Sequence, residues 1–279
     1  MKDLRIFLYT DNRTPKLRLE DVALYLEDKC RAFISEVRDE FFTHWLGPHH
    51  PAFRDQMIES LSQRLARARI RNQVGRNPLS EPLAGEVEFE RLKLVDQGVA
   101  AFGYLYDAPK FLDICGELIE TEERGPEFAH IVFTNQLLAS WDEADGKYHA
   151  RTIVCGGVGV VSTTGLVEAP AKSPEYYLLT QQSAASGISG LAELAITPQI
   201  AAEALFYEDD RITDVVKGYV LQAVMYQLTG QPFCDDPGCR LFNARSQKQM
   251  LHAQLDEAYD LCPKHEAFFH AFQRAGVES

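Results

Sequence analysis

Four side chains near the C-terminal end of the sequence have the types and the spacing of a metal site. Cys234 and Cys239 form a Cys-x4-Cys pair, and Cys262 and His265 form a Cys-x2-His pair further along the chain. Three thiolates and one imidazole are ligands that suit tetrahedral zinc. Because protein groups would fill all four coordination positions, none is left for water, and the ion would be structural. The sequence therefore predicts one structural zinc ion at these four residues.

The residues around these ligands fit the same interpretation. Asp235, Pro237 and Gly238 favour a turn that brings both thiolates of the first pair to one ion. The tetrapeptide 262–265 predicts a knuckle that leads into the last helix. The other three cysteines are isolated in apolar or helix-like stretches and are predicted to be small buried side chains. They are Cys30, Cys115 and Cys155.

The remaining histidines lack the spacing of a metal site. Three of them flank a Gly-Pro pair and are predicted to lie on a surface loop over residues 44–51. These are His44, His49 and His50. The others are predicted to be structural or to face solvent. They are His130, His149, His252 and His270.

The order of these features resembles the archaemetzincins, a metzincin group of zinc-dependent peptidases. In that family a helix with the motif H-E-x-x-H-x-x-G-x-x-H runs directly into Cys-x4-Cys-x-Met, and a Cys-x2-Cys pair follows. Cys234 and Cys239 match the first pair, and Cys262 matches the third cysteine. His265 replaces the fourth cysteine, and Leu241 stands at the methionine position. The resemblance is specific over residues 234–265 and only topological over about 125–230.

The same resemblance places the catalytic motif on residues 223–233, where every catalytic group is replaced. Ala223, Gln227 and Phe233 stand at the three zinc-binding histidine positions, and Val224 stands at the position of the general base. Neither Ala nor Phe can ligate a metal, and Val cannot take a proton from zinc-bound water. The resemblance thus implies a metzincin-like fold that keeps a structural zinc and lacks the catalytic one.

The elements that position these residues mix strands with helices. Strands are predicted over 4–9, 32–42, 129–138 and 150–169. Helices are predicted over 19–30, 53–70, 110–120, 173–182, 198–207, 214–229, 244–259 and 265–275. This mixture predicts an α/β fold. The resemblance adds a metzincin-like twisted mixed sheet with packed helices and a C-terminal zinc knuckle, in which helix 214–229 packs against the sheet.

Two portions of the chain are distinguished by this interpretation. Residues 1–120 form an N-terminal α/β portion, which could belong to the same domain as the rest. Residues 121–279 form the metzincin-like core with the C-terminal zinc site. The connection at 73–85 contains two prolines and two glycines and is the best candidate for a flexible link.

Composition excludes several classes of function. The chain carries 41 acidic and 28 basic residues, a net charge of −13, whereas nucleic-acid binding needs clustered Lys and Arg. No apolar run is long enough to span a bilayer, and the N-terminal stretch carries too many charges for a secretion signal. The sequence therefore favours a cytoplasmic protein that binds neither nucleic acid nor membrane.

Two functions of different classes remain. The first is a soluble metzincin relative without catalysis, stabilised by zinc, whose former substrate cleft binds a peptide or a partner protein. The alternative is an active hydrolase or peptidase that uses non-standard cleft residues. The candidates for that role are Glu168, His149 and His130.

Overall fold

A five-stranded sheet forms the centre of the protein. In the computed structural model, residues 3–75, 81–96, 99, 103–186, 197–256 and 259–277 are described. The strands are β1 (Leu4–Tyr9), β2 (Phe33–Arg38), β5 (Phe128–Thr134), β8 (Ile153–Val154) and β9 (Gly159–Ser162). Their order is β2-β1-β5-β9-β8. The first four run parallel, and β8 pairs antiparallel with β9 at the edge.

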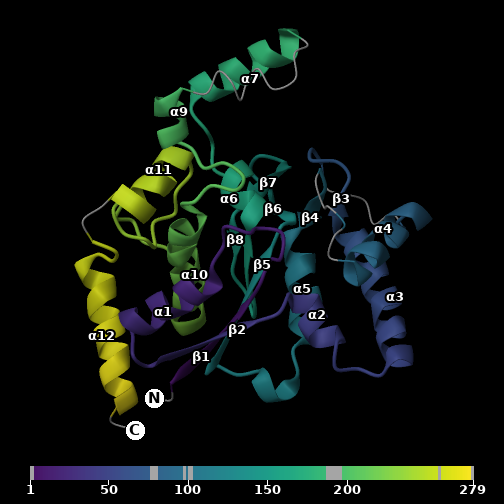
Figure 1. Ribbon diagram of the computed structural model, residues 1–279, viewed down its shortest axis with the longest axis horizontal. Coiled ribbons are helices and arrows are strands. Elements are labelled where there is room, and N and C mark those ends of the chain that lie inside the picture. The colour runs from purple at the N-terminus through teal and green to yellow at the C-terminus, as the bar shows by residue number, and fades with distance from the viewer. Residues whose placement is uncertain are drawn as a thin grey trace.

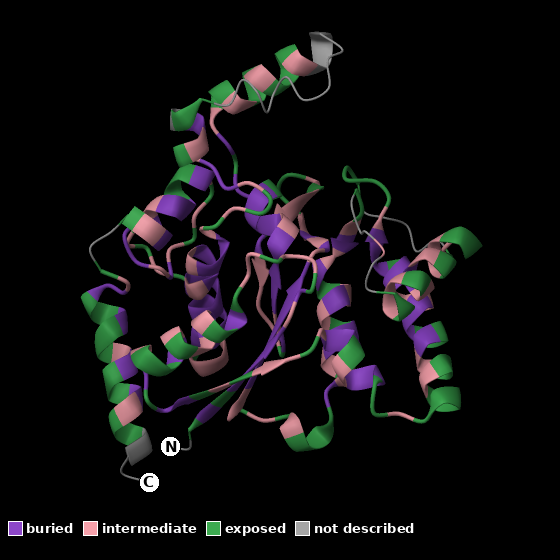
Figure 2. Ribbon diagram, viewed as in Figure 1, coloured by how far each residue is buried: buried purple, intermediate pink, exposed green. Residues whose placement is uncertain are grey.

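Both faces of this sheet are buried. Along β1, Ile6 and Leu8 face one hydrophobic layer, and Phe7 and Tyr9 face the other. A near-continuous apolar strand of this kind is expected in a parallel sheet that helices cover on both sides. Figure 2 shows the inner strands β1 and β5 buried along most of their length, whereas the edge strand β2 is largely intermediate or exposed.

Helices pack in two layers around the sheet (Figure 1). The first layer holds α1 (Leu19–Lys29), α10 (Ile212–Thr229) and α12 (Pro263–Val277). The second layer holds α2 (Phe41–Leu46), α3 (Pro51–Ala68) and α5 (Ala108–Leu118), and α4 (Ala84–Val95) packs against α3. Helices on both faces of a mostly parallel sheet define an α/β architecture, so the predicted fold class is confirmed.

A second, smaller sheet has the order β3-β4-β6-β7. Its strands are β3 (Arg69–Ile70), β4 (Leu105–Asp107), β6 (Leu137–Asp142) and β7 (Lys147–Arg151). Strands β6 and β7 form an antiparallel hairpin with its turn at residues 143–146. Gly146 has φ +62°, which a glycine adopts without strain.

The remaining elements are short or lie at the periphery. They are η1 (Thr121–Glu123), α6 (Thr163–Glu168), α7 (Pro174–Ser186), α9 (Pro198–Ala202), α11 (Gln247–Leu251) and a π-helical turn, η2 (His252–Asp256). Helix α7 extends away from the rest of the molecule at the top of Figure 1. Ser173 accepts a hydrogen bond from the N–H of Tyr176, so it caps α7 as its Ser-Pro sequence predicts.

Helix α10 is the main support of the first layer. Residues 215, 216, 220, 221 and 224 are fully buried, and the helix contacts β5, β8 and β9. It ends at Gly230, which has φ 74° in the left-handed region typical of a helix C-cap. The predicted packing of helix 214–229 against the sheet is therefore confirmed.

Four predicted elements in the second half differ from the structure. The stretch 150–169 is not one β segment, because β9 ends at Ser162, whose hydroxyl accepts a hydrogen bond from the N–H of Gly165 and caps α6. The stretch 129–138 divides into β5 and β6, which belong to different sheets. The helix predicted over 244–259 begins only at Gln247, and the one predicted over 198–207 ends at Ala202.

The loop predicted over 44–51 is confirmed only at residues 47–50, which include His49 and His50, and its two ends are helical. Helix α2 includes His44, since the Glu40 carboxylate accepts a hydrogen bond from the N–H of Thr43 and starts a helix there. Helix α3 begins at Pro51, a residue that fits the first turn. The strand predicted over 32–42 ends at Arg38, because the Glu40 cap starts helix α2 at Phe41.

Strands from both sides of residue 120 pair in the central sheet, since β1 lies between β2 and β5. Of the connection predicted at 73–85, residues 76–80 lie outside the described residues. None of the described helices is both long and apolar enough to cross a lipid bilayer.

Candidate metal centre and adjacent cleft

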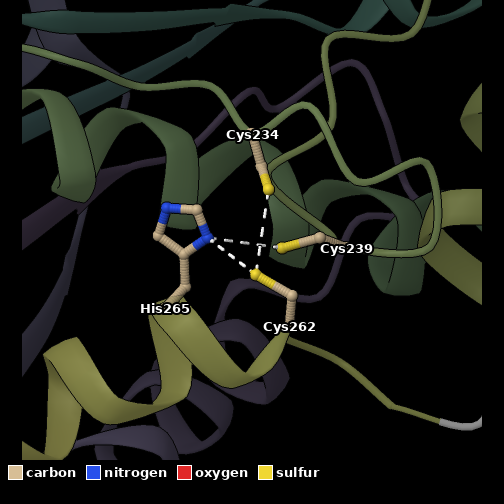
Figure 3. Close-up of side chains that lie close together, drawn as sticks. All are labelled: Cys234, Cys239, Cys262 and His265. Carbon is tan, nitrogen blue, oxygen red and sulfur yellow. Dashed lines mark hydrogen bonds between the residues drawn. The ribbon is translucent and has the colours of Figure 1, made fainter.

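The four predicted zinc ligands lie together in the structure (Figure 3). One ligand atom from each of Cys234, Cys239, Cys262 and His265 lies within 4.8 Å of all the others. The Sγ atoms of Cys234 and Cys262 are 3.8 Å apart. Nδ1 of His265 lies 3.2 Å from Sγ of Cys262 and 3.8 Å from Sγ of Cys239.

These distances match the edges of a metal tetrahedron. With Zn–S bonds of about 2.3 Å and Zn–N bonds of about 2.0 Å, two sulfurs lie roughly 3.8 Å apart and sulfur and nitrogen roughly 3.5 Å. A disulfide would bring two sulfurs to about 2.05 Å, and all six cysteines are free. The arrangement is therefore that of a ligand set and not of a cross-link.

Local hydrogen bonds position both pairs of ligands. The N–H of Cys234 donates to the carbonyl of Leu241, and the N–H of Cys239 donates to the carbonyl of Asp236. The Asp236 carboxylate accepts a hydrogen bond from the N–H of Gly238, which closes the turn. Cys262 directly precedes α12, so the first turn of that helix carries His265 toward the sulfurs.

Burial disfavours the charged forms of Cys234, Cys239 and His265 when no cation is present. Cys239, Cys262 and His265 are 0%, 6% and 5% exposed. Burial raises the pKa of the Cys239 thiol to about 12 and also raises the pKa of the Cys234 thiol. It lowers the pKa of His265, which leaves a neutral imidazole that can ligate a metal. A metal cation would reverse the effect on the thiols by stabilising their thiolate forms.

A cavity of about 770 Å³ lies beside helix α10. The edge strand β8 borders it together with four aromatic side chains. These are Tyr219 and Tyr226 on α10, Phe233 just after that helix, and Phe242. Gln222 of α10 also lines the cavity, is 1% exposed, and has an Oε1 atom without a hydrogen-bond partner in the described part of the chain. A buried acceptor of this kind is rare unless a ligand or water pairs with it.

The positions that the resemblance assigns to catalysis carry no metal ligands. Val224 is fully buried in the hydrophobic core, and Ala223 is 6% exposed. Strand β9 approaches the helix so closely here that a Cβ added to Gly159 would lie 2.9 Å from the Cβ of Ala223. Phe233 is 43% exposed on the wall of the cavity. Among the described residues, no group able to hold a metal includes any of residues 223–233.

The three residues considered for an alternative hydrolase have separate partners. His130 is buried, and its ring nitrogens contact the Tyr9 hydroxyl and the Glu123 carbonyl at 2.9 Å each. The carboxylate of Glu168 accepts a hydrogen bond from the Tyr207 hydroxyl. Only His149 lines the large cavity, and its Nε2 lies 2.7 Å from a carboxylate oxygen of Asp145.

The structure brings together three polar side chains that the sequence did not single out as a set. Ligand atoms of Asp142, Asp145 and His149 lie within 4.8 Å of one another on the β6–β7 hairpin. The segment 141–149 predicts a turn, and the hairpin has one. The spacing Asp-x2-Asp-x3-His across a tight hairpin was the available signal, because antiparallel pairing places the two strand ends side by side.

Two comparisons relate the chain to known proteins. A family model described as a probable metallopeptidase family (DUF6775) matches residues 2–272. A crystal structure of archaemetzincin from Methanopyrus kandleri is similar at 10% sequence identity and a TM-score of 0.45, covering 100% of this chain and 97% of that chain. No curated protein matches the sequence.

Proposed function

The chain belongs to the probable metallopeptidase family that it matches over residues 2–272, and from that premise we propose that it binds an extended peptide without zinc-dependent catalysis. One observation carries the proposal. The cavity of about 770 Å³ lies between a sheet edge and helix α10, and the helix offers it no metal ligand.

The border of the cavity supports peptide binding. Strand β8 ends the central sheet, and no other described strand pairs with its outer edge. An extended peptide can add a strand to such an edge through main-chain hydrogen bonds, while adjoining pockets take alternate side chains. Tyr226 and Phe233 offer apolar contact area along that path.

The packing of α10 supports the loss of catalysis. A metal-activated water needs protein ligands that hold the ion and a base that takes the proton. Ala223 lies against β9, and Val224 contributes to the core, so neither side chain can be exchanged for a catalytic group without repacking. The Cys/His cluster cannot substitute, since its four ligands leave no position for water.

The same proposal assigns a structural zinc ion to Cys234, Cys239, Cys262 and His265. The ligand distances and the burial of three of the four side chains support it. All six cysteines are free, which fits a reducing compartment, and we place the protein in the cytoplasm.

Peptide binding is tested with a library of fluorescent extended peptides and the full-length protein. The variant Phe233→Ala should bind the selected peptide about tenfold more weakly, because an aromatic contact in the cavity is lost. Phe53→Ala is the matched control, since Phe53 is similarly exposed at 52% but lies on α3. Absence of saturable binding to the wild type would contradict the proposal.

Catalysis is tested with the same library after reconstitution with zinc. We expect no cleavage above background. Cleavage that a chelator abolishes while the fold survives would establish the alternative, an active hydrolase with a metal bound by other cleft residues.

A further inference from the structure

Another cavity lies at the carboxyl ends of strands β1 and β5, and its lining includes no residue of helix α10. The two strands are neighbours in the central sheet, but the chain continues from them in opposite directions. Strand β1 leads through α1 to β2 on one side, and β5 leads to β9 on the other. In open α/β sheets, ligands bind in the crevice outside the carboxyl ends of the strands where the strand order reverses in this way. The topology therefore marks this cavity as a ligand site.

Charged side chains of both signs line the cavity. The carboxylates are those of Asp11 and Glu40, and the cations are Arg13 and Lys93. Asn135 adds a carboxamide, which can both donate and accept hydrogen bonds. Two groups of each sign suit a ligand that is neutral overall but carries both charges.

Contacts within the protein hold one group of each sign in place. The hydroxyl of Thr163 donates a hydrogen bond of 2.6 Å to Oδ2 of Asp11. The side chain of Lys93 is 8% exposed, and its ammonium donates to Glu90 and Tyr106 at 2.9 and 2.8 Å. Because an ammonium has three N–H donors, one remains for the carboxylate of a ligand.

The two carboxylates favour a bound cation. Burial raises the pKa of Glu40, and the negative charge of Asp11 adds to this effect. An ammonium group bound in the cavity would favour the ionised form of both side chains. Asp11 and Glu40 belong to no group of three metal ligands within the described residues, so an organic ammonium fits here better than a metal ion.

The size and the apolar part of the lining narrow the choice of ligand. The cavity has a volume of about 60 Å³, whereas a single water molecule needs about 10–15 Å³, so only a few non-hydrogen atoms fit. Phe42, Leu65 and Phe133 form an apolar part of the lining. We propose that this cavity binds a free α-amino acid with a small apolar side chain, such as alanine. Lys93 and Arg13 receive its carboxylate, and the acidic side chains receive its ammonium group.

Binding is tested by calorimetric titration of L-alanine into the full-length protein. We expect one alanine per chain with a dissociation constant of about 1 mM or lower, which is within reach of a ligand with so few atoms. Acetate and methylamine each carry only one of the two charges. Each should bind at least tenfold more weakly, because it leaves part of the charged lining unpaired. Equal affinity for either ion, or no binding of alanine, would overturn the proposal.

Two variants locate the bound alanine. Glu40→Gln removes a charge but keeps an oxygen that can cap helix α2, and it should weaken binding about tenfold or more. Asn135→Ala removes the carboxamide and should weaken binding about fivefold. The matched controls are Glu59→Gln on α3 and Asn243→Ala in the cavity beside α10. Both should keep the affinity within about twofold. Unchanged affinity in either Glu40→Gln or Asn135→Ala would contradict this placement of the ligand.

Discussion

The Cys/His cluster and the end of helix α10 are neighbours in the sequence, but only the cluster carries metal ligands at the positions that the family pattern assigns. The cluster begins at Cys234, just after the helix ends at Thr229, and it brings four ligands within 4.8 Å of one another. The positions on and after α10 that the resemblance assigns to a catalytic metal hold Ala223, Gln227 and Phe233. One region is a complete ligand set, and the other has none.

Under the proposed function, this difference separates a metal's role in folding from its role in chemistry. The cluster joins the loop that follows α10 to the start of α12, two segments that no named sheet connects. The free energy of metal binding at such a site is also free energy of folding. Residues 223 and 224 contribute to stability through packing in the core, so the fold there does not depend on metal ligands.

The largest expected effect comes from breaking the cluster. Cys262→Ser should lower the free energy of unfolding by more than about 3 kcal/mol, a part of the ~10–16 kcal/mol that structural zinc contributes in zinc-finger peptides. Helix α12 should lose protection first, because Cys262 and His265 fix its first turn. Chemical denaturation, zinc content and amide hydrogen exchange over 263–277 measure these effects.

Cys155→Ser is the matched control for that experiment. Cys155 is partly buried but lies outside the cluster, so its variant should keep its zinc and most of its stability. Equal zinc content and stability in the two variants would mean that the cluster is not a structural metal site.

A smaller effect is expected from restoring histidines to α10. Ala223→His should destabilise the fold by about 1–3 kcal/mol through overpacking, because β9 lies against Ala223 at Gly159. Gln227→His is the matched control, since Gln227 is only half-buried one turn further along the helix. Urea unfolding of both variants measures the difference. A neutral Ala223→His variant would show that this part of the cleft still has room for a metal ligand.

Sequence patterns predicted those features that depend on local spacing. The four cluster residues follow from two short motifs and lie together as predicted, and a glycine directly after an apolar helical segment indicates the cap at Gly230. Helix α10 was predictable because its buried residues form a long apolar segment that ends at a glycine. In each case the determining residues are close in sequence or belong to two compact pairs.

Features that depend on tertiary contacts were not predictable. The apolar residues over 129–138 do not reveal that β5 and β6 enter different sheets, because strand partners decide that division. The β-branched residues after Gly159 favour a strand, yet the Ser162 cap turns the chain into α6.

The smallest expected effect concerns an ion pair of the central sheet, remote in sequence from the cluster and from α10. Arg38 on β2 donates two hydrogen bonds, of 2.6 and 2.7 Å, to the Glu123 carboxylate, and this contact lowers the pKa of Glu123. The unfolded chain therefore binds its proton at a higher pH than the folded chain does. The stabilisation is complete above the unfolded pKa of about 4.3 and is lost as pH falls through the folded value.

Glu123→Gln should accordingly cost about 1 kcal/mol near neutral pH, since the pair is only partly shielded from solvent, and the cost should vanish in acid. Acid also releases zinc from thiolate and imidazole ligands, but that loss is common to wild type and variant and cancels in their difference. Urea unfolding at several pH values measures the difference, and Glu88→Gln, which removes a solvent-exposed pair with Arg91, should show none. If instead the cost of Glu123→Gln grew toward low pH, the two effects would be coupled, and the folding role of the metal would reach beyond the segments that the cluster joins.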